Sequence, residues 1–315
     1  MAKFEFENGE TLENVEVEYL IKGKPKYDES GNITNLLIFC HGYEGNCLSL
    51  NEFSQFTDEG MPLDYSNFLI MSIASLGFPG SCCPSSSGLY HDFPQYTFKD
   101  KVNFKKQFIK EKLSAENVLG VFGVGMGGYE VYTWACEYPN DMKFIIAGNS
   151  SYKTAGYRYV VVKGIKSVIE SNPNFASGSY DESLSNTMIA VYKLIFSTYF
   201  SQKLFQKMSN DEIDVYMDSF VEKSFSIDVY DLKFQYDALL GFDLTDQLHN
   251  IKAKTLVVSP KEDLYFSSDF DVFPLKEFID DCQIELIDFK RNKYDEMDFS
   301  NAMEIFYSFM ENFKD

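Results

Sequence analysis

Short apolar runs, rich in β-branched and aromatic residues, recur along the chain and are separated by polar loops and helical patterns. Their apolarity is continuous rather than alternating, which is typical of strands covered on both faces, as in a parallel sheet. Six runs show this pattern: 35–42 (NLLIFCHG), 67–75 (NFLIMSIAS), 117–123 (NVLGVFG), 143–150 (KFIIAGNS), 254–260 (KTLVVSP) and 284–289 (IELIDF).

Helical patterns at 98–113, 129–139 and 297–313 alternate with these strands, which predicts an α/β fold. The start of the chain, KFEFENGETLENVEVEYLI, predicts an antiparallel hairpin with Asn8-Gly9 near its turn. We therefore expect a mostly parallel central sheet with an antiparallel edge.

Between Ser151 and Leu248 the strand pattern stops and the sequence is mainly helical, including segments 157–173 and 184–208. An insertion of this size predicts a helical lid, residues 151–248, beside the strand ends of a core made of 1–150 and 249–315.

Composition excludes several functions. The 315 residues hold 28 Lys plus Arg against 48 Asp plus Glu, a net charge of −20, which repels nucleic acids and anionic lipids. No apolar stretch approaches the roughly 20 residues that span a bilayer, and the N-terminus does not resemble a leader. We expect a cytoplasmic protein with neither nucleic acid nor membrane as partner.

The six cysteines are scattered and there are only three histidines, so no metal-ligand spacing appears. We expect no metal, no cofactor and a reducing compartment. Cys82-Cys83 is either a redox pair or two small apolar residues that fill space.

The stretch from Gly123 to Gly128, GVGMGG, fits two glycine patterns. One is the phosphate-binding loop of a dinucleotide fold, and the other is the nucleophile elbow G-x-S-x-G with glycine in place of serine. A dinucleotide loop follows the first strand and precedes an acidic residue by about 20 positions. Here at least two core strands come earlier, and the next strand ends in AGNS without an acid.

An elbow also requires an upstream loop whose backbone N–H groups form an oxyanion hole. His41-Gly42 follows the strand LLIFC and supplies such a loop. Asp263 follows the strand TLVVS and occupies the place of a triad acid, although a solvated loop aspartate is the plainer alternative.

In this order the chain resembles the homoserine O-acetyltransferase family of the α/β-hydrolase fold. The resemblance extends over nearly the whole chain and includes the lid. It rests on FCHGYEG (39–45), GSCCPSSSGLYHDFPQYTFKD (80–100), GVGMGGYEVYTWACEYP (123–139), IKSVIESNPNFASGSY (165–180) and IKAKTLVVSPKEDLYF (251–266).

The resemblance implies a serine nucleophile, a histidine base and an aspartate. Gly125 stands at the serine position, and glycine has no atom that can attack a carbonyl group. Tyr294, within Lys293-Tyr294-Asp295, stands at the histidine position, and a tyrosine with an ordinary pKa near 10 is a poor base at neutral pH. Asp263 keeps the position of the acid.

The resemblance further implies oxyanion donors at Tyr43 and Met126, and it aligns Tyr192, ahead of Thr198-Tyr199, with an arginine that binds the substrate carboxylate. It also implies a homodimer formed through the lid.

These losses favour a non-catalytic protein that binds a small acyl or carboxylate ligand, or a partner. The alternative is an acyltransferase or esterase that uses a displaced nucleophile or the retained oxyanion pocket. Ser150 and Ser151 are candidates for such a nucleophile, and His91 and His249 for a base.

Overall fold

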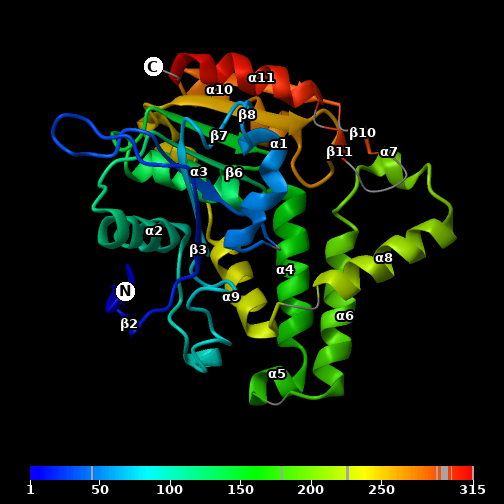
Figure 1. Cartoon of the computed structure of the whole chain (residues 1–315). Coiled ribbons are helices and arrows are strands. Elements are labelled where there is room, and N and C mark those ends of the chain that lie inside the picture. Colours follow the sequence, from blue (N-terminus) through cyan, green and yellow to red (C-terminus); the bar gives the residue numbers. More distant parts are fainter. Residues whose placement is uncertain are drawn as a thin grey trace.

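The structure is a computed structural model that describes residues 1–43, 45–178, 180–224, 227–288, 290–291, 297–298 and 300–313. Within these residues a seven-stranded sheet forms the centre, in the order β3-β5-β4-β6-β7-β8-β9 (Figure 1). Its strands are β3 (Tyr19–Lys22), β4 (Leu36–Cys40), β5 (Leu69–Ile73), β6 (Gly120–Val124), β7 (Phe144–Gly148), β8 (Lys254–Pro260) and β9 (Cys282–Ile287). β3 pairs antiparallel with β5 and the other neighbours are parallel, so the predicted sheet is confirmed.

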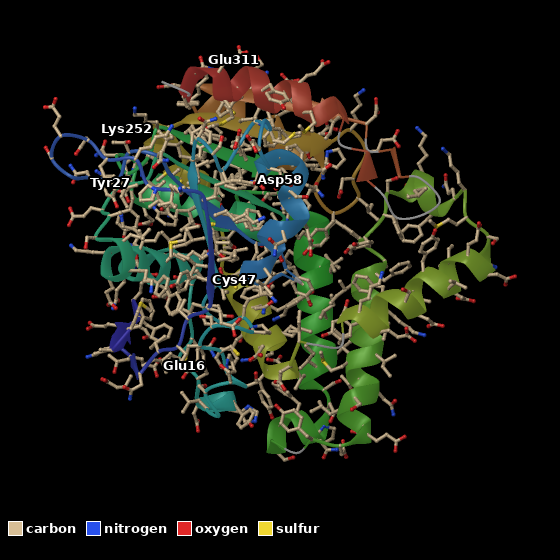
Figure 2. All side chains as sticks on the ribbon, viewed as in Figure 1. Glu16, Tyr27, Cys47, Asp58, Lys252 and Glu311 are labelled. Carbon is tan, nitrogen blue, oxygen red and sulfur yellow. The ribbon has the colours of Figure 1, made fainter. Side chains whose placement is uncertain are left out.

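Successive residues of the central strands face opposite layers, which explains their continuous apolarity. Leu36 and Ile38 of β4 pack in one apolar cluster together with α2 (Phe98–Leu113) and α3 (Met126–Glu137). Leu37 and Phe39 pack in a second cluster with residues of α1 (Ser54–Thr57) and α11 (Ser300–Met310). Side chains fill the space between the sheet and its helices, while Lys252 and Glu311 lie at the periphery (Figure 2).

The helix predicted at 98–113 is α2, and its ends are fixed by local chemistry. Thr97 and Asp100 form a reciprocal capping box at its start, and Ser114 ends it in a left-handed conformation with φ 53°. The helix predicted at 129–139 is α3, which begins earlier, at Met126.

The predicted N-terminal hairpin is confirmed, because β1 (Lys3–Glu5) pairs antiparallel with β2 (Thr11–Glu13). The prediction of a helix over 297–313 is wrong at its start. Residues 297–298 form β11 (Met297–Asp298), paired with β10 (Lys290–Arg291), and α11 covers only 300–310. The remaining short elements are η1 (Cys47–Phe53), η2 (Tyr90–Asp92), η3 (Thr245–Asn250), η4 (Ser268–Val272), α10 (Leu275–Phe278) and η5 (Glu311–Phe313).

The segment between β7 and β8 is helical in the described residues. Its helices are α4 (Gly156–Glu170), α5 (Pro173–Ser177), α6 (Glu182–Phe196), α7 (Gln202–Phe205), α8 (Asn210–Ser224) and α9 (Val229–Leu240). In Figure 1 α5, α6 and α8 extend away from the sheet. The helix expected over 184–208 is interrupted, because α6 ends at Phe196 and α7 begins at Gln202. We keep the name lid for residues 151–248, and its role as a separate unit stays a prediction.

None of the helices in the described part of the chain combines the length and apolarity needed to cross a membrane.

Candidate active site

Gly125 occupies a sharp turn between β6 and α3. Its backbone has φ 53° and ψ −120°, a conformation that residues with a side chain rarely adopt. Its N–H group donates to the Gly148 carbonyl oxygen of β7 at 3.0 Å, and its own carbonyl accepts from the Ser150 hydroxyl group at 2.7 Å. A Cβ atom built on Gly125 meets nothing within 4 Å. The turn therefore has the geometry of a nucleophile elbow and open space where the nucleophile's side chain would begin.

The neighbouring glycines serve the packing of α3 against the sheet. A Cβ on Gly127 would lie 2.0 Å from the Cys40 carbonyl oxygen, and one on Gly123 would lie 2.7 Å from the same atom. A Cβ on Gly128 would lie 2.3 Å from the Ser150 hydroxyl oxygen. These glycines are explained by close approach of helix and strands, and they need no phosphate ligand.

The loop after β4 lies against the elbow. A Cβ on Gly42 would be 3.5 Å from the Val124 carbonyl oxygen, at the end of β6. Tyr43 follows, half-buried, with its ring 6.2 Å from that of Tyr236 in α9 and nearly perpendicular to it. Met126 is the first residue of α3, where a backbone N–H group has no acceptor within the helix. Both residues expected to form the oxyanion hole thus lie on segments that adjoin Gly125.

His41 is a structural part of this loop. It is buried, its Nδ1 lies 3.0 Å from the Gly42 carbonyl oxygen, and its Nε2 accepts from the Ser75 N–H group at 3.0 Å. Burial and the nearby Lys105 ammonium group lower the pKa of His41 to about 4, so the ring is neutral at pH 7. Both ring nitrogens are engaged, which leaves His41 without a free nitrogen for catalysis.

A buried ionic network lies behind His41. The Ser75 hydroxyl group donates to Glu130 Oε1 at 2.5 Å, and Glu130 Oε2 is 2.6 Å from the ammonium nitrogen of Lys105. Lys101, one helical turn before Lys105 on α2, is also fully buried. The sequence pattern alone did not identify this network, because helical lysines are usually exposed.

Asp263 lies after β8, at the position expected for the triad acid. Its Oδ1 accepts from the N–H groups of Tyr265 and Phe266, each at 2.7 Å, and its Oδ2 accepts from the Asn149 side chain at 3.3 Å. Asn149 follows Gly148, the residue that binds the Gly125 N–H group. Burial raises the pKa of the Asp263 carboxyl group, while the hydrogen bonds from Phe266, Tyr265 and Asn149 oppose that shift.

The other candidates are not brought to the elbow in the same way. Tyr294 lies outside the described residues. Tyr192 is buried in α6 and its hydroxyl group donates to the Ile227 carbonyl oxygen at 3.1 Å, so a ligand would have to replace this bond. His91 lies 3.2 Å from the Tyr230 hydroxyl group at the lid, and His249 is exposed on η3.

Ser150 and Ser151, the candidates for an alternative nucleophile, both form hydrogen bonds with neighbouring groups. Ser150 is buried with its hydroxyl group on the Gly125 carbonyl, and Ser151 donates to Asp271 Oδ1 at 2.8 Å. Asp271 also forms a buried ion pair with Arg158 of α4, at 2.6 Å, and Arg158 donates to the Ser151 hydroxyl oxygen at 2.8 Å. The sequence pattern does not predict this pair, and its one signal in the sequence is a single arginine inside the apolar run YRYVVV.

A cavity of about 430 Å³ opens beside Asp263, between α7 of the lid and the loop after β8. We call it the Asp263 cavity. Its walls are polar on both sides, and Lys203 and Glu262 form an ion pair across it at 2.8 Å. The lining residues are Ser201, Gln202, Lys203, Gln206, Glu262, Asp263 and Leu264. The arrangement suits a small polar molecule better than a long apolar chain.

No group of three His, Cys, Asp or Glu side chains with the geometry of a metal site occurs in the described ranges.

No family model matches the sequence. The chain is 33% identical over 313 residues to a protein of Methanothermobacter thermautotrophicus named "Probable acyltransferase", covering 98% of this chain and 96% of the relative. It is 23% identical over 332 residues to a homoserine O-acetyltransferase of Pasteurella multocida, covering 91% and 88% of the two chains.

Among solved structures, the homoserine O-acetyltransferase of Bacillus anthracis superposes with a TM-score of 0.82 at 18% identity. The match covers 98% of this chain and 95% of that chain, which establishes the fold. Together with the relatives in sequence, the elbow, the preceding loop and the helices inserted between β7 and β8 lead to one conclusion: the chain belongs to the homoserine O-acetyltransferase family of the α/β-hydrolase fold.

Proposed function

We propose that this protein is a non-catalytic member of its family that binds a small polar ligand bearing an acyl or carboxylate group. The observation that carries the proposal is Gly125, which holds the elbow conformation with open space in place of a nucleophile. A covalent acyl intermediate needs a side-chain oxygen or sulfur atom at that point, and glycine offers none. Tyr294 at the position of the base supports the proposal from the sequence.

The binding part of the proposal rests on backbone groups. Oxyanion donors are N–H groups, so the side-chain losses at 125 and 294 leave them in place. The Asp263 cavity supplies side-chain hydrogen bonds nearby. We therefore expect a ligand that combines a carbonyl or carboxylate group with further polar groups.

Two activity assays test the non-catalytic part: acetyl transfer from acetyl-CoA to homoserine, and hydrolysis of p-nitrophenyl acetate. We expect no turnover above a heat-inactivated control. A thermal-shift screen against CoA esters and amino acids tests the binding part. Hits should weaken in Gln206→Ala, at the wall of the Asp263 cavity, and persist in Gln55→Ala, which is exposed on α1 outside that cavity.

The second candidate is an acyltransferase or esterase with a displaced nucleophile, and the name of the 33% identical relative supports it. Ser150 is adjacent to the elbow, but its hydroxyl group already binds the Gly125 carbonyl. Robust turnover that is abolished in Ser150→Ala or Asp263→Ala, with folding retained, would establish this candidate and reject the non-catalytic one.

Two further expectations belong to the proposal. A cytoplasmic location is supported by the six cysteines, all of which are free thiols. A homodimer through the lid is supported by apolar side chains that remain exposed on its helices, such as Val160 on α4 and Leu194 on α6. Light scattering of the wild type and of Val160→Glu tests the dimer, which should dissociate in the variant.

A further inference from the structure

A second hollow lies beside the later turns of α3, whereas the elbow lies at the start of this helix. Its volume is about 540 Å³, within the range of small-molecule sites. It shares no lining residue with the Asp263 cavity. Its walls on α3 are Thr133 and Glu137, about 10 to 16 Å along the helix from Met126 at 1.5 Å for each residue. We call it the acidic hollow.

Four segments line the acidic hollow: the hairpin of β1 and β2, the start of α2, the end of α3, and the end of α9 with the loop after it. Its floor is apolar. The rings of Phe98 and Phe242 lie 4.7 Å apart, with Ala238 and Leu244 beside them. Aromatic faces carry partial negative charge and attract cations that come within about 6 Å.

The rim is acidic. It carries the four carboxylates of Glu7, Glu137, Asp237 and Asp243, against the ammonium group of Lys99. Lys99 is bound between Glu7 and Glu137 at 3.3 and 2.9 Å, so its charge is already shared.

The net charge of the rim stays negative when the lysines that pair with its carboxylates from outside the hollow are included. Asp237 pairs with Lys166 and Lys233, which leaves four carboxylates against three lysines. Asp243 accepts hydrogen bonds from the N–H and hydroxyl groups of Thr245, at 2.9 and 2.6 Å, and forms no ion pair among the residues that the structure describes. Asp243 is thus the carboxylate best able to accept a cation.

We propose that the acidic hollow is a binding site for a small organic cation, an ammonium group carried on an aromatic or short aliphatic body. The apolar floor accommodates the body, and the carboxylate of Asp243 pairs with the ammonium group. An anionic ligand is excluded by the rim, and the net charge of −20 adds long-range attraction for cations. A bare metal ion would leave the aromatic floor unused.

The experiment uses benzylammonium as the probe, with benzyl alcohol as the neutral analogue and benzoate as the anionic one. Isothermal titration calorimetry with the full chain at low salt measures the three affinities. We expect benzylammonium to bind about tenfold more tightly than benzyl alcohol, a difference of about 1.4 kcal/mol, because only the ammonium group can pair with the Asp243 carboxylate. Benzoate should not bind in the acidic hollow, so any heat that it gives at another site should be unchanged in the Asp243→Asn variant described below. Equal affinities for the charged and neutral probes would overturn the proposal.

Variants locate the binding. Asp243→Asn keeps an acceptor for Thr245 and removes the charge, and we expect about a tenfold weaker affinity. Asp246→Asn, three residues on and outside the hollow, is the matched control with the same change of net charge. An equal loss in both variants would mean that only the overall field attracts the probe, which contradicts a site.

Gly241→Trp blocks the hollow from its wall. A Cβ on Gly241 meets nothing within 4 Å, and its φ of −90° is open to any residue, so the fold should tolerate the change. We expect this variant to lose benzylammonium binding. Unchanged binding would place the probe elsewhere on the molecule and refute the assignment, without bearing on the proposed function at the elbow.

Discussion

Lys101 is a buried ammonium group that the fold accommodates at a cost, and its replacement by methionine should stabilise the protein. The side chain is inaccessible to solvent, and its nitrogen lies 4.2 Å from the ring centroid of Phe78, 5.1 Å from Phe98 and 5.3 Å from Tyr96. Nζ has no hydrogen-bond partner among the described residues. Glu130 is the carboxylate that acts on Lys101 within the described part of the chain, and it is already paired with Lys105.

The magnitude follows from the pKa. Burial, opposed by Glu130 and reinforced by Lys105, lowers the pKa of Lys101 from 10.5 to about 7. At 1.36 kcal/mol for each pH unit, this difference corresponds to a penalty of about 5 kcal/mol on the folded state when the pH is well below 7. Cation–π attraction to the aromatic rings offsets part of that penalty, by about 2 kcal/mol for a desolvated cation. The net gain expected for Lys101→Met at pH 6 is therefore about 2 to 4 kcal/mol.

The sign of the pH dependence is fixed by the same pKa. The unfolded chain holds the Lys101 proton up to pH 10.5, whereas the folded chain releases it from about pH 7, so stability rises with pH between these values. From pH 6 to pH 9 the penalty decreases by about 3 kcal/mol. The advantage of the methionine variant should shrink by that amount over this interval.

Urea unfolding of the wild type and Lys101→Met from pH 6 to pH 9 measures the difference in free energy of unfolding. Taking the difference removes the titration of other groups shared by both proteins, such as the buried Cys40 thiol. Lys112→Met, exposed on the same helix, is the control and should show no such trend. A difference that stays constant with pH, or a destabilised Lys101→Met, would refute the reasoning.

Three other substitutions test the site. Gly125→Ser should lower the free energy of unfolding by about 1 kcal/mol, since φ 53° strains any residue with a Cβ, and should restore no p-nitrophenyl acetate hydrolysis by itself. Glu130→Gln leaves Lys105 buried without its anion and should cost about 3 to 5 kcal/mol in urea unfolding. Arg158→Met should cost a similar amount by stranding Asp271, and the double variant with Asp271→Leu should recover most of it, whereas an additive loss would argue against a coupled pair.

The sheet could be predicted because its strands are buried on both faces, and this burial is visible in consecutive residues. In runs such as LLIFC and LIMSI every residue is buried, so buried and exposed positions do not alternate and the strand is recognised from consecutive residues. The end of the helix predicted over 184–208 could not be placed in the same way. α6 stops at Phe196 while the apolar pattern continues, and only tertiary packing of the lid decides where the chain turns.

The site could be predicted in part. Gly125 and Asp263 are predictable because Gly125 directly follows β6 and Asp263 lies three residues after the end of β8. Parallel strands bring their carboxyl ends to one edge of the sheet. Arg158 and Asp271 are 113 residues apart, and a contact of that separation has no local signature. Tyr192 shows the opposite problem, since alignment with a family position does not reveal that its hydroxyl group binds the backbone at Ile227.

The glycines of the elbow separate what the fold requires from what the chemistry requires. Gly123 and Gly127 allow the Cys40 carbonyl to approach, so a side chain at either position would displace the helix or the strand. Gly125 is under no such constraint, because open space surrounds its missing Cβ and only its φ favours glycine. A serine at position 125 would have a strained backbone but would supply a reactive hydroxyl group. If the protein does not use that hydroxyl group, the strain has no functional benefit. Glycine at this position alone removes strain while the packing around it is unchanged, which supports the proposal that the fold is retained and nucleophilic catalysis is not.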